Sequence, residues 1–384
     1  MRVALISNTL PPEGRGGAEA YVADLAQELA ERGHDVVVLT GARAPRPVVP
    51  VISLPGLAPL DPHANPARKA AWHALDQWLP SVHSAVKREL ARFRPDVVHT
   101  HAVQGLSAAV FTAIRGLGLR HVHTAHDLGL LCARVTMTRD GEFCGGRSPS
   151  CLVQRAIRAR AAASRLDLLV APSDHIRRRH VEFGLLDEAK TLTIRQGTSP
   201  AEPVERPVAS PERPRVGYLG SLSPVKGIET LLNAFATAPA HWRLAVAGSG
   251  ELEPLVVGRA AVDDRVEFLG HLDGARKDAF LAELDVIVIP SEWEENAPLV
   301  AVEAAVRGLP AVVSDRGGLP ELPGVEVFRA RDREALVAAV ARLVDRPDRL
   351  RELSRSLIDS HDGFLWKTHA TQIERVLAQV ASAR

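Results

Sequence analysis

Residues 285–310, DVIVIPSEWEENAPLVAVEAAVRGLP, place a short apolar strand directly before a helix. The run VIVI at 286–289 is β-branched and has the length of a buried parallel strand, and the Pro-Ser pair after it ends the strand. Asn296 is a favourable N-cap and Pro298 suits a first helical turn. This order predicts an α/β fold in which a helix N-terminus offers an anion site at the edge of a sheet.

The same alternation of strand and helix recurs along the chain. Further strands are predicted at residues 2–7, 34–40, 96–99, 121–124, 168–171, 215–220, 242–247, 265–270 and 311–314. Helices are predicted at residues 18–32, 81–93, 103–117, 228–238, 333–344 and 366–380. The alternation predicts doubly wound parallel sheets, whose ligands bind beyond the carboxyl ends of the strands.

The length of 384 residues favours two domains. A proline-rich segment at 198–214 is the clearest linker. We therefore predict one domain over residues 1–197 and a second over 198–365, with a last helix in 366–384. The net charge of +1 predicts no general attraction to nucleic acid.

Membrane and redox features are few. The N-terminus resembles a first strand more than a signal peptide, and no window approaches the ~18 apolar residues of a membrane span. Cys132, Cys144 and Cys151 are an odd number of cysteines, which favours a cytoplasmic protein. Their spacing is not that of a zinc ribbon, so we expect reduced thiols that pack a loop, with a bound metal as the alternative.

Residues 151–180 carry seven arginines against two aspartates. Arg155, Arg158 and Arg160 fall along a predicted helix. A solvated helix face is the first interpretation. The alternative is that the basic face over 155–179 contacts a phosphorylated acceptor or anionic lipid headgroups at a membrane surface.

Two carboxylates accompany the predicted anion site. Glu295 precedes the helix, and Glu303 lies inside it, roughly 7.5 Å along the axis from Pro298. A carboxylate near a bound anion is unfavourable unless it has another role, and accepting hydrogen bonds from sugar hydroxyls is one. A solvated acidic turn is the alternative.

Other loops after predicted strands carry residues suited to a ligand. Lys226 ends the loop after residues 215–220 and can neutralise a pyrophosphate. Gly16 and Gly17 allow close approach of a ligand to the first helix, whose first turn holds Glu19.

His126 and Asp127 follow the strand at 121–124, where side chains face a ligand cleft. The long irregular segment 41–80, which contains Trp72, is a candidate lid on the acceptor side.

Taken in order, these motifs resemble retaining GT-B glycosyltransferases of glycosyltransferase family 4. The motifs are Gly-Gly-Ala-Glu, His-Asp, the Lys-Gly loop, Phe-Leu-Gly, Pro-Ser with Glu-x7-Glu, and Gly-Gly-Leu-Pro-Glu, and they cover nearly the whole chain. The resemblance implies two facing Rossmann-like domains with an interdomain cleft. Residues 1–197 would bind the acceptor and 198–365 the nucleotide sugar, and the last helix would cross back onto the first domain.

The resemblance also implies roles for individual residues. His126, Glu295 and Lys226 would be catalytic. Donor contacts would come from Gly16, Gly17, Ser221, Lys226, Asn296, Ala297, Leu299, Val300 and Glu303, and acceptor-side contacts from Glu19, Asp127 and Trp72. Many relatives have arginine where this chain has Ser221, so a cationic contact would have to come from Arg195, Arg265 or Arg316.

The activity implied is transfer of a sugar from a nucleotide to an acceptor hydroxyl, with retained configuration and without a cofactor or catalytic metal. A UDP-hexose or UDP-N-acetylhexosamine and a soluble acceptor are the first expectation, for a monomer or homodimer. The alternatives are a GDP-sugar enzyme acting on a lipid-linked saccharide, a non-catalytic binding subunit, an epimerase and a glycosyl phosphorylase.

Overall fold

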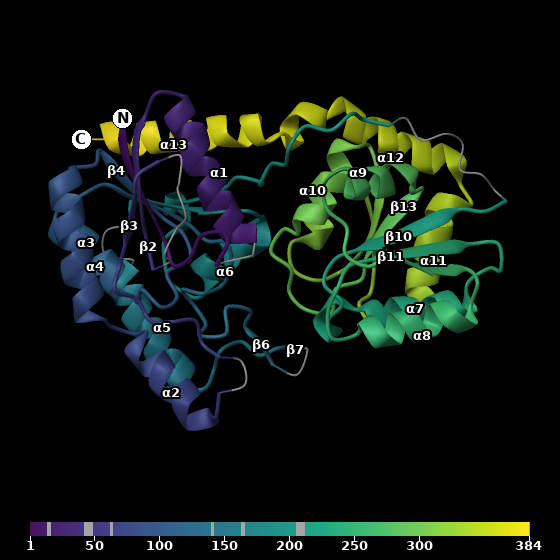
Figure 1. The fold of residues 1–384 in the computed structure, drawn as a ribbon, viewed down its shortest axis with the longest axis horizontal. Helices are drawn as coiled ribbons and strands as arrows, with labels where there is room; N and C mark the ends of the chain where they lie inside the picture. Colours follow the sequence, from purple (N-terminus) through teal and green to yellow (C-terminus); the bar gives the residue numbers. More distant parts are fainter. Residues whose placement is uncertain are drawn as a thin grey trace. The chain divides into compact units, whose positions relative to one another are not determined.

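The computed structural model describes residues 1–13, 17–41, 49–61, 64–139, 142–162, 166–204 and 212–383. The chain forms two compact units (Figure 1). The first contains residues 1–139, 144–194 and 370–384, and the second contains residues 140–143 and 195–369. Along the chain, residues 140–143 and 195–369 belong to the second unit, and the remaining residues, including those from Ala370 in the last helix, belong to the first.

The first unit is built on a seven-stranded, wholly parallel sheet in the order β3-β2-β1-β4-β5-β8-β9. Its strands are β1 (Arg2–Ser7), β2 (Asp35–Thr40), β3 (Val51–Ser53), β4 (Val97–Thr100), β5 (His121–Thr124), β8 (Leu168–Ala171) and β9 (Thr191–Thr193). Its helices are α1 (Gly17–Glu31), α2 (Pro66–Leu75), α3 (Pro80–Phe93), α4 (Ala109–Gly116), α5 (Pro149–Ala162) and α6 (Asp174–Glu182). The strands β6 (Thr138–Arg139) and β7 (Glu142–Phe143) form a separate two-stranded sheet.

The second unit repeats the design with six parallel strands in the order β12-β11-β10-β13-β14-β15. Its strands are β10 (Arg215–Leu219), β11 (Arg243–Ala247), β12 (Val266–Phe268), β13 (Val286–Ile289), β14 (Ala311–Ser314) and β15 (Val325–Phe328). Its helices are α7 (Ile228–Thr237), α8 (Glu253–Val262), α9 (Gly274–Glu283), α10 (Leu299–Val306), α11 (Arg333–Val344) and α12 (Pro347–Asp359). Both sheets thus have the strand order of a doubly wound fold, which confirms the predicted α/β class.

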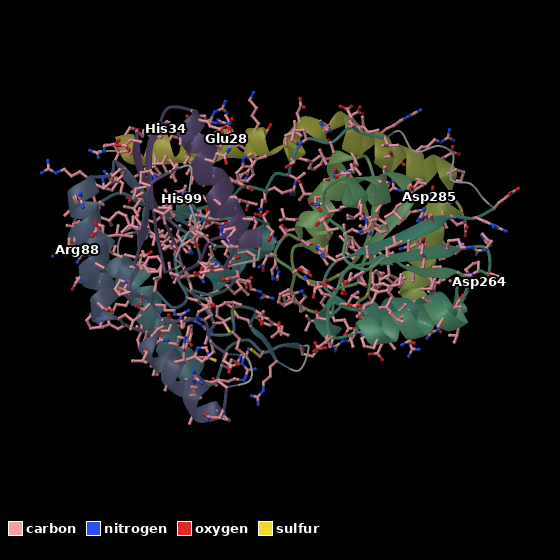
Figure 2. The ribbon with its side chains drawn as sticks, in the orientation of Figure 1. Glu28, His34, Arg88, His99, Asp264 and Asp285 are labelled. Carbon is pink, nitrogen blue, oxygen red and sulfur yellow. The ribbon has the colours of Figure 1, made fainter. Side chains whose placement is uncertain are left out.

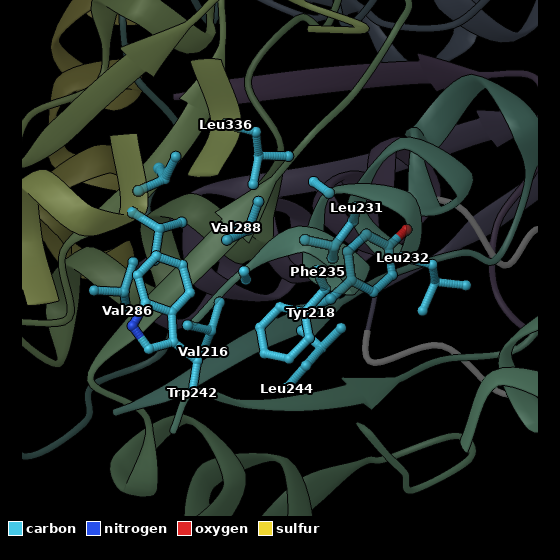
Figure 3. Packing of buried hydrophobic residues seen from close by; sticks show 14 of the residues in the cluster. Val216, Tyr218, Leu231, Leu232, Phe235, Trp242, Leu244, Val286, Val288 and Leu336 are labelled. Atoms are coloured by element: carbon cyan, nitrogen blue, oxygen red, sulfur yellow. The ribbon is translucent and has the colours of Figure 1, made fainter. Parts of the chain in front are cut away.

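Each sheet has its own apolar core. In the second unit, Trp242, Phe235 and Tyr218 pack with the valines and leucines of β10, β11 and β13 (Figure 3). Phe235 belongs to α7 and Trp242 lies just before β11. The strand β13 is buried along its whole length, which explains why its sequence is continuously apolar rather than alternating. The core of the first unit joins β1, β2 and β4 to α3 and α4.

The last helix, α13 (Trp366–Ser382), begins in the second unit and continues from Ala370 in the first. There Glu374 accepts hydrogen bonds from Arg32 Nη1 at 2.8 Å and pairs with His34 Nε2 at 2.7 Å. Figure 2 shows Glu28 and His34 beside this helix. Side-chain hydrogen bonds to the turn between α1 and β2 therefore hold this end of α13 within the first unit.

Several predicted bounds are wrong. The helix expected from residue 103 begins at Ala109, because residues 104–106 form a turn with Gly105 at positive φ. The strand β15 and the helix α12 were not predicted. β15 is half-exposed at the edge of its sheet. The helix α12 is strongly amphipathic, and the helical spacing of Leu350, Leu353 and Leu357 could have predicted it.

Candidate functional site

The candidate site of the second unit lies at the carboxyl ends of β10 and β13, where the strand order of the sheet reverses. Lys226 ends the loop after β10, and Glu295 lies in the loop after β13. Lys226 Nζ is 2.7 Å from Glu295 Oε1. The same oxygen accepts a hydrogen bond from Ser291 Oγ at 2.6 Å. Glu295 is only 4 % exposed, so this carboxylate is held in one place by an ammonium and a hydroxyl.

The aromatic ring of Trp293 also contacts Lys226. The ammonium lies 4.8 Å from the centre of the Trp293 ring, within the range of a cation–π contact. The neighbouring Glu292 is turned away, because it accepts from Thr230 Oγ1 at 2.7 Å and from Arg331 Nε at 2.8 Å. The acidic loop after β13 is therefore an ordered set of paired groups rather than a solvated turn.

Glycines bring the backbone of this loop against its neighbours. Gly318 N donates to Glu295 O at 2.7 Å. Gly317 has φ +61°, and a Cβ there would overlap the carbonyl of Glu295. Gly227 has φ +71°, and a Cβ there would overlap the carbonyl of Pro290. The loops after β10, β13 and β14 thus pack backbone to backbone around the Lys226–Glu295 pair.

The helix α10 begins later than the sequence suggests. Its N-cap is Pro298, with no side-chain cap, so the prediction that Asn296 caps the helix is wrong. Asn296 and Ala297 lie in the loop before it, with Asn296 at a bend. The first helical amides belong to Leu299 and Val300, which have no intrahelical acceptor and point from the helix N-terminus toward the edge of the sheet. They are half-buried.

Glu303 has a partner that the sequence did not reveal. Its Oε1 lies 2.6 Å from Nζ of Lys277, which belongs to α9. No motif links residues 277 and 303, so this pairing depends on the packing of α9 against α10. The predicted ribose-binding carboxylate is therefore held in place by a lysine.

Ser221, at the position where the family resemblance led us to expect an arginine, is exposed in the loop after β10. Its carbonyl accepts from the hydroxyl of Tyr218 at 2.7 Å. Arg265 does not replace the missing charge, since its guanidinium bonds Asp263 and lies at the amino end of β12. Arg316 lies in the loop after β14, on the same edge as Lys226. Arg195 donates to the carbonyl of Glu321 at 2.9 Å.

The candidate site of the first unit lies at the equivalent point, at the carboxyl ends of β1, β4 and β5. His126, two residues after β5, has its Nε2 3.1 Å from Nδ1 of His101, which follows β4. Tyr21 of α1 meets the His126 ring edge-on, with centroids 4.8 Å apart. The pairing with His101 and Tyr21 was not predicted, because it joins three elements that are far apart in the sequence.

Glu19 and Asp127 lie near this histidine. Glu19 accepts from Thr9 Oγ1 at 3.2 Å, and Asp127 accepts from Gly129 N at 2.6 Å. Burial raises the pKa of Asp127 to about 6. Gly17 is the first residue of α1, whereas the predicted contact at Gly16 lies outside the described residues.

Trp72 belongs to α2, where its indole N–H donates to the carbonyl of Ala58 at 2.9 Å. It therefore anchors that helix to the preceding segment. The prediction of a continuous basic face over residues 155–179 is wrong for Arg158, which is buried and lies 2.7 Å from Asp76. Arg177 is also paired, with Asp174 and Glu188.

The three cysteines are free thiols, with Cys132 buried and Cys144 exposed. Within the described ranges, no group of three or more His, Cys, Asp and Glu side chains is arranged to hold a metal ion. No helix of the described part of the chain is long and apolar enough to cross a bilayer.

Two doubly wound parallel sheets, each with charged and polar groups at its switch point, define a GT-B glycosyltransferase fold. The model of Glycosyltransferase Family 4 matches residues 15–202, and that of Glycosyl transferases group 1 matches residues 213–346. The chain belongs to this family of glycosyltransferases, which confirms the resemblance of its motifs.

Curated relatives support the same class. The chain is 28 % identical over 413 residues to a glycogen synthase of Mycobacterium tuberculosis, covering 98 % of this chain and 94 % of that one. It is 29 % identical over 355 residues to a D-inositol 3-phosphate glycosyltransferase of Mycolicibacterium vanbaalenii, covering 83 % and 76 %. It is 28 % identical over 425 residues to an MMP alpha-(1->4)-mannosyltransferase of Mycolicibacterium hassiacum, covering the full length of both.

Solved structures share the fold. Sucrose-phosphate synthase from Thermosynechococcus elongatus has a TM-score of 0.73 at 24 % identity over the full length of both chains. Anabaena HepE in complex with UDP-glucose has a TM-score of 0.70 at 19 % identity, covering 99 % of this chain and all of that one. The protein is thus a glycosyltransferase of GT-B architecture.

Proposed function

We propose that the protein transfers a hexose or N-acetylhexosamine from its UDP derivative to an acceptor hydroxyl, with retained configuration and without a catalytic metal. The observation that carries the proposal is the Lys226–Glu295 pair at the switch point of the second sheet. An ammonium at the edge of the sheet where α10 begins suits a diphosphate, and a fixed carboxylate suits sugar hydroxyls.

In the proposed reaction the bond from the anomeric carbon to the diphosphate oxygen breaks as a bond to the acceptor oxygen forms on the same face. The acceptor proton passes to the leaving phosphate oxygen. Lys226 and the amides of Leu299 and Val300 stabilise the charge that develops on the diphosphate. They thereby supply what a divalent cation provides in other transferases. His126 contacts a hydroxyl of the donor sugar, and Glu303 contacts the ribose.

UDP is preferred over other nucleotides because HepE, a structural neighbour, is solved with UDP and with UDP-glucose. A soluble cyclitol is the preferred acceptor class, in line with the inositol phosphate glycosyltransferases among the relatives. GDP-sugars are the alternative donors, since a mannosyltransferase is also among the relatives.

The test is a thermal-shift screen with UDP-glucose, UDP-N-acetylglucosamine, GDP-mannose, ADP-glucose and TDP-glucose. A ligand that binds only the folded protein raises the melting temperature. We expect a rise with the UDP-sugars that is lost in Glu303→Gln, a change that keeps a hydrogen bond to Lys277 but removes the charge.

The matched control is Glu326→Gln, because Glu326 also pairs with basic side chains but lies on β15 beside Arg342 and Arg349. This variant should retain the full shift. A rise with GDP-mannose alone would replace UDP with GDP in the proposal. If no nucleotide sugar changes the melting temperature, the donor site is wrongly assigned.

Metal independence has a separate test. Turnover of the sugar identified by the screen should be unchanged after dialysis against EDTA, because Lys226 and the helix amides carry the charge stabilisation. Loss of turnover that added Mg²⁺ or Mn²⁺ restores would overturn this part of the proposal. The anomeric configuration of the product, read by NMR, tests retention.

A lipid-linked acceptor is a second candidate, and exposed apolar residues favour it. Leu152, Val153 and Ile157 of α5 are 52 %, 61 % and 39 % exposed, and Arg160 of the same helix is exposed. Apolar and basic side chains on one helix suit an anionic membrane surface. Co-sedimentation with vesicles containing anionic lipid, reduced by Leu152→Ser with Val153→Ser, would favour this acceptor class. The absence of co-sedimentation would reject the lipid-linked acceptor and favour the soluble one.

A further inference from the structure

His101 and His126 form a close pair of imidazole rings in the first unit. His101 is 1 % exposed, directly after β4. Its Nδ1 lies 3.1 Å from His126 Nε2, and the two ring planes are 26° apart. Tyr21 packs against the other side of the pair, with its centroid 4.8 Å from that of His126 and 5.6 Å from that of His101. The orientation of the His126 ring is therefore fixed by two buried side chains.

The charge state of His101 follows from its surroundings. Burial lowers the pKa of His101 well below its ordinary value, and the nearby His99, His123 and His126 lower it further. The rings of His99 and His101 are 4.2 Å apart, inside the sheet region where Figure 2 labels His99. His101 is thus a neutral imidazole, with one proton to place on either Nδ1 or Nε2.

The two positions of that proton are not equivalent. His101 Nε2 is buried and has no hydrogen-bond partner among the described residues. A proton on Nε2 would therefore leave an N–H group unpaired in the interior, which is rarer and more costly than an unpaired acceptor. A proton on Nδ1 would instead be donated to Nε2 of His126. His101 is accordingly the donor of this hydrogen bond, and His126 Nε2 is the acceptor.

We propose that His101 is a positioning residue whose Nδ1–H holds His126 as the neutral tautomer with its own proton on Nδ1. A second proton on His126 would place two N–H groups face to face, so His126 remains neutral and serves as a hydrogen-bond donor. Its part in turnover rests on the proposed function, in which His126 contacts the donor sugar. The tautomer itself does not depend on that function.

Other titratable groups also face the pair. They are Tyr21 and Glu19 on α1, His99 beside His101, and His123 and Asp127 on the side of β5. Burial raises the pKa of Tyr21 above its ordinary value, so this phenol is neutral. A measurement at pH 7.5 lies above the pKa of Asp127, about 6, and keeps the charge of the surroundings constant.

The first test is NMR of the full chain labelled with ¹⁵N-histidine, since imidazole nitrogen shifts separate the two tautomers. The His126 signal is assigned by its loss in His126→Gln. We expect the Nδ1–H tautomer for His126 in the unaltered protein. A His126 ring protonated on Nε2 would overturn the proposal, and this experiment requires neither a substrate nor an altered His101.

The second test compares His101→Phe with His101→Asn. Phenylalanine keeps the ring but has no donor, whereas the asparagine amide can place an N–H where Nδ1 lies. We expect Phe to shift His126 toward the Nε2–H tautomer. We also expect it to lower kcat roughly 10- to 100-fold, by analogy with the loss of an outer partner of a metal-bound histidine. KM for the nucleotide sugar should stay within about twofold, and Asn should restore both the tautomer and kcat.

The control is His180→Phe. His180 is another fully buried imidazole, bonded to the carbonyl of Ile176 in α6. The His180→Phe variant should have a lower free energy of unfolding but an unchanged His126 tautomer. An unchanged tautomer in His101→Phe, or an equal loss of kcat in the Phe and Asn variants, would show that His101 is merely structural. Absence of binding by any nucleotide sugar would instead reject the proposed function and leave the tautomer result intact.

Discussion

At the scale of single residues, Lys226 is the cation to which we assign the stabilisation of the diphosphate. Lys226→Met keeps much of the side-chain volume but removes the charge that stabilises the leaving group. We expect kcat to fall by roughly 10²- to 10³-fold, the usual cost of removing one group of this kind. Steady-state kinetics with the donor found in the thermal-shift screen checks this.

Lys190→Met serves as the control, because Lys190 is exposed in the first unit and has no part in the proposed site. Equal activity in the two variants would show that Lys226 does not contact the leaving group. Glu295 keeps its hydrogen bond from Ser291 in the Lys226 variant, so the loop after β13 should remain folded.

Substitution of two glycines distinguishes the cost of backbone strain from the cost of a steric overlap. Gly317 and Gly270 have nearly the same φ, +61° and +66°, but a Cβ would overlap the Glu295 carbonyl only at Gly317. Gly270→Ala should therefore cost about 1 kcal/mol of unfolding free energy from strain alone. Gly317→Ala should cost about 3 kcal/mol or more and also weaken donor binding, since it displaces the loop that holds Glu295.

Chemical denaturation of both variants measures the two costs. A similar loss of stability in both would mean that the loops after β13 and β14 can separate without penalty. The backbone contact between Glu295 and Gly318 would then not hold the site together.

At the scale of elements, one buried ion pair joins α2 to α5. Arg158 is 5 % exposed, and Asp76 is fully buried and also accepts from Gly105 N at 2.7 Å. Burial raises the pKa of Asp76 to about 6 even though Arg158 and backbone amides favour its charge. The pair therefore carries a large desolvation cost and depends on the presence of both partners.

Arg158→Met should destabilise the protein by about 3 kcal/mol at pH 7.5, because it leaves a buried carboxylate without its cation. Adding Asp76→Asn should recover more than half of that loss, since the amide oxygen can still accept from Gly105. Urea denaturation provides the measurement. Arg160→Met, an exposed arginine of the same helix, should have little effect, and a loss as large as that of Arg158→Met would contradict the role of the buried pair.

At the scale of the whole molecule, buried histidines set the response to acid. Burial lowers the pKa of His121 to about 3 and those of His180 and His369 to about 4, and it lowers the pKa values of His101 and His123 well below the ordinary value. These rings are uncharged when folded but take up protons near pH 6.5 when unfolded. Their contribution to stability is therefore complete above pH 6.5 and is lost as the pH falls.

The buried aspartates oppose this trend. The pKa values of Asp76 and Asp127 are raised to about 6, so the folded protein binds their protons first as the pH falls. Near pH 5 the unfolded chain binds about five more protons at these histidines, and the folded protein binds about two more at these aspartates. Unfolding therefore takes up a net of about three protons, so the free energy of unfolding falls by roughly 4 kcal/mol per pH unit as the pH decreases. Urea denaturation at pH 7.5, 6, 5.5 and 5 should show this decline. A constant or rising stability over that range would contradict the neutral state of the buried rings.

The local pattern of the sequence determined the fold class and the position of most elements. The run at 286–289, the glycines after the strands and the Glu-x7-Glu spacing are local, and each has a direct physical consequence for a strand, a turn or a helix. Because parallel strands end at one edge of their sheet, the sequence alone is enough to select Lys226, Glu295 and His126 as candidate site residues.

Only the tertiary structure decided what these residues contact. Lys277 meets Glu303 because α9 packs beside α10, and His101 meets His126 because β4 and β5 are neighbours in the sheet. The sequence pattern around Arg158 resembles an exposed basic face, but Arg158 is buried in an ion pair with Asp76. Pairing and burial depend on groups that are distant in the sequence. Contacts of this kind produce no periodic pattern of residues along the chain, so the sequence alone did not predict them.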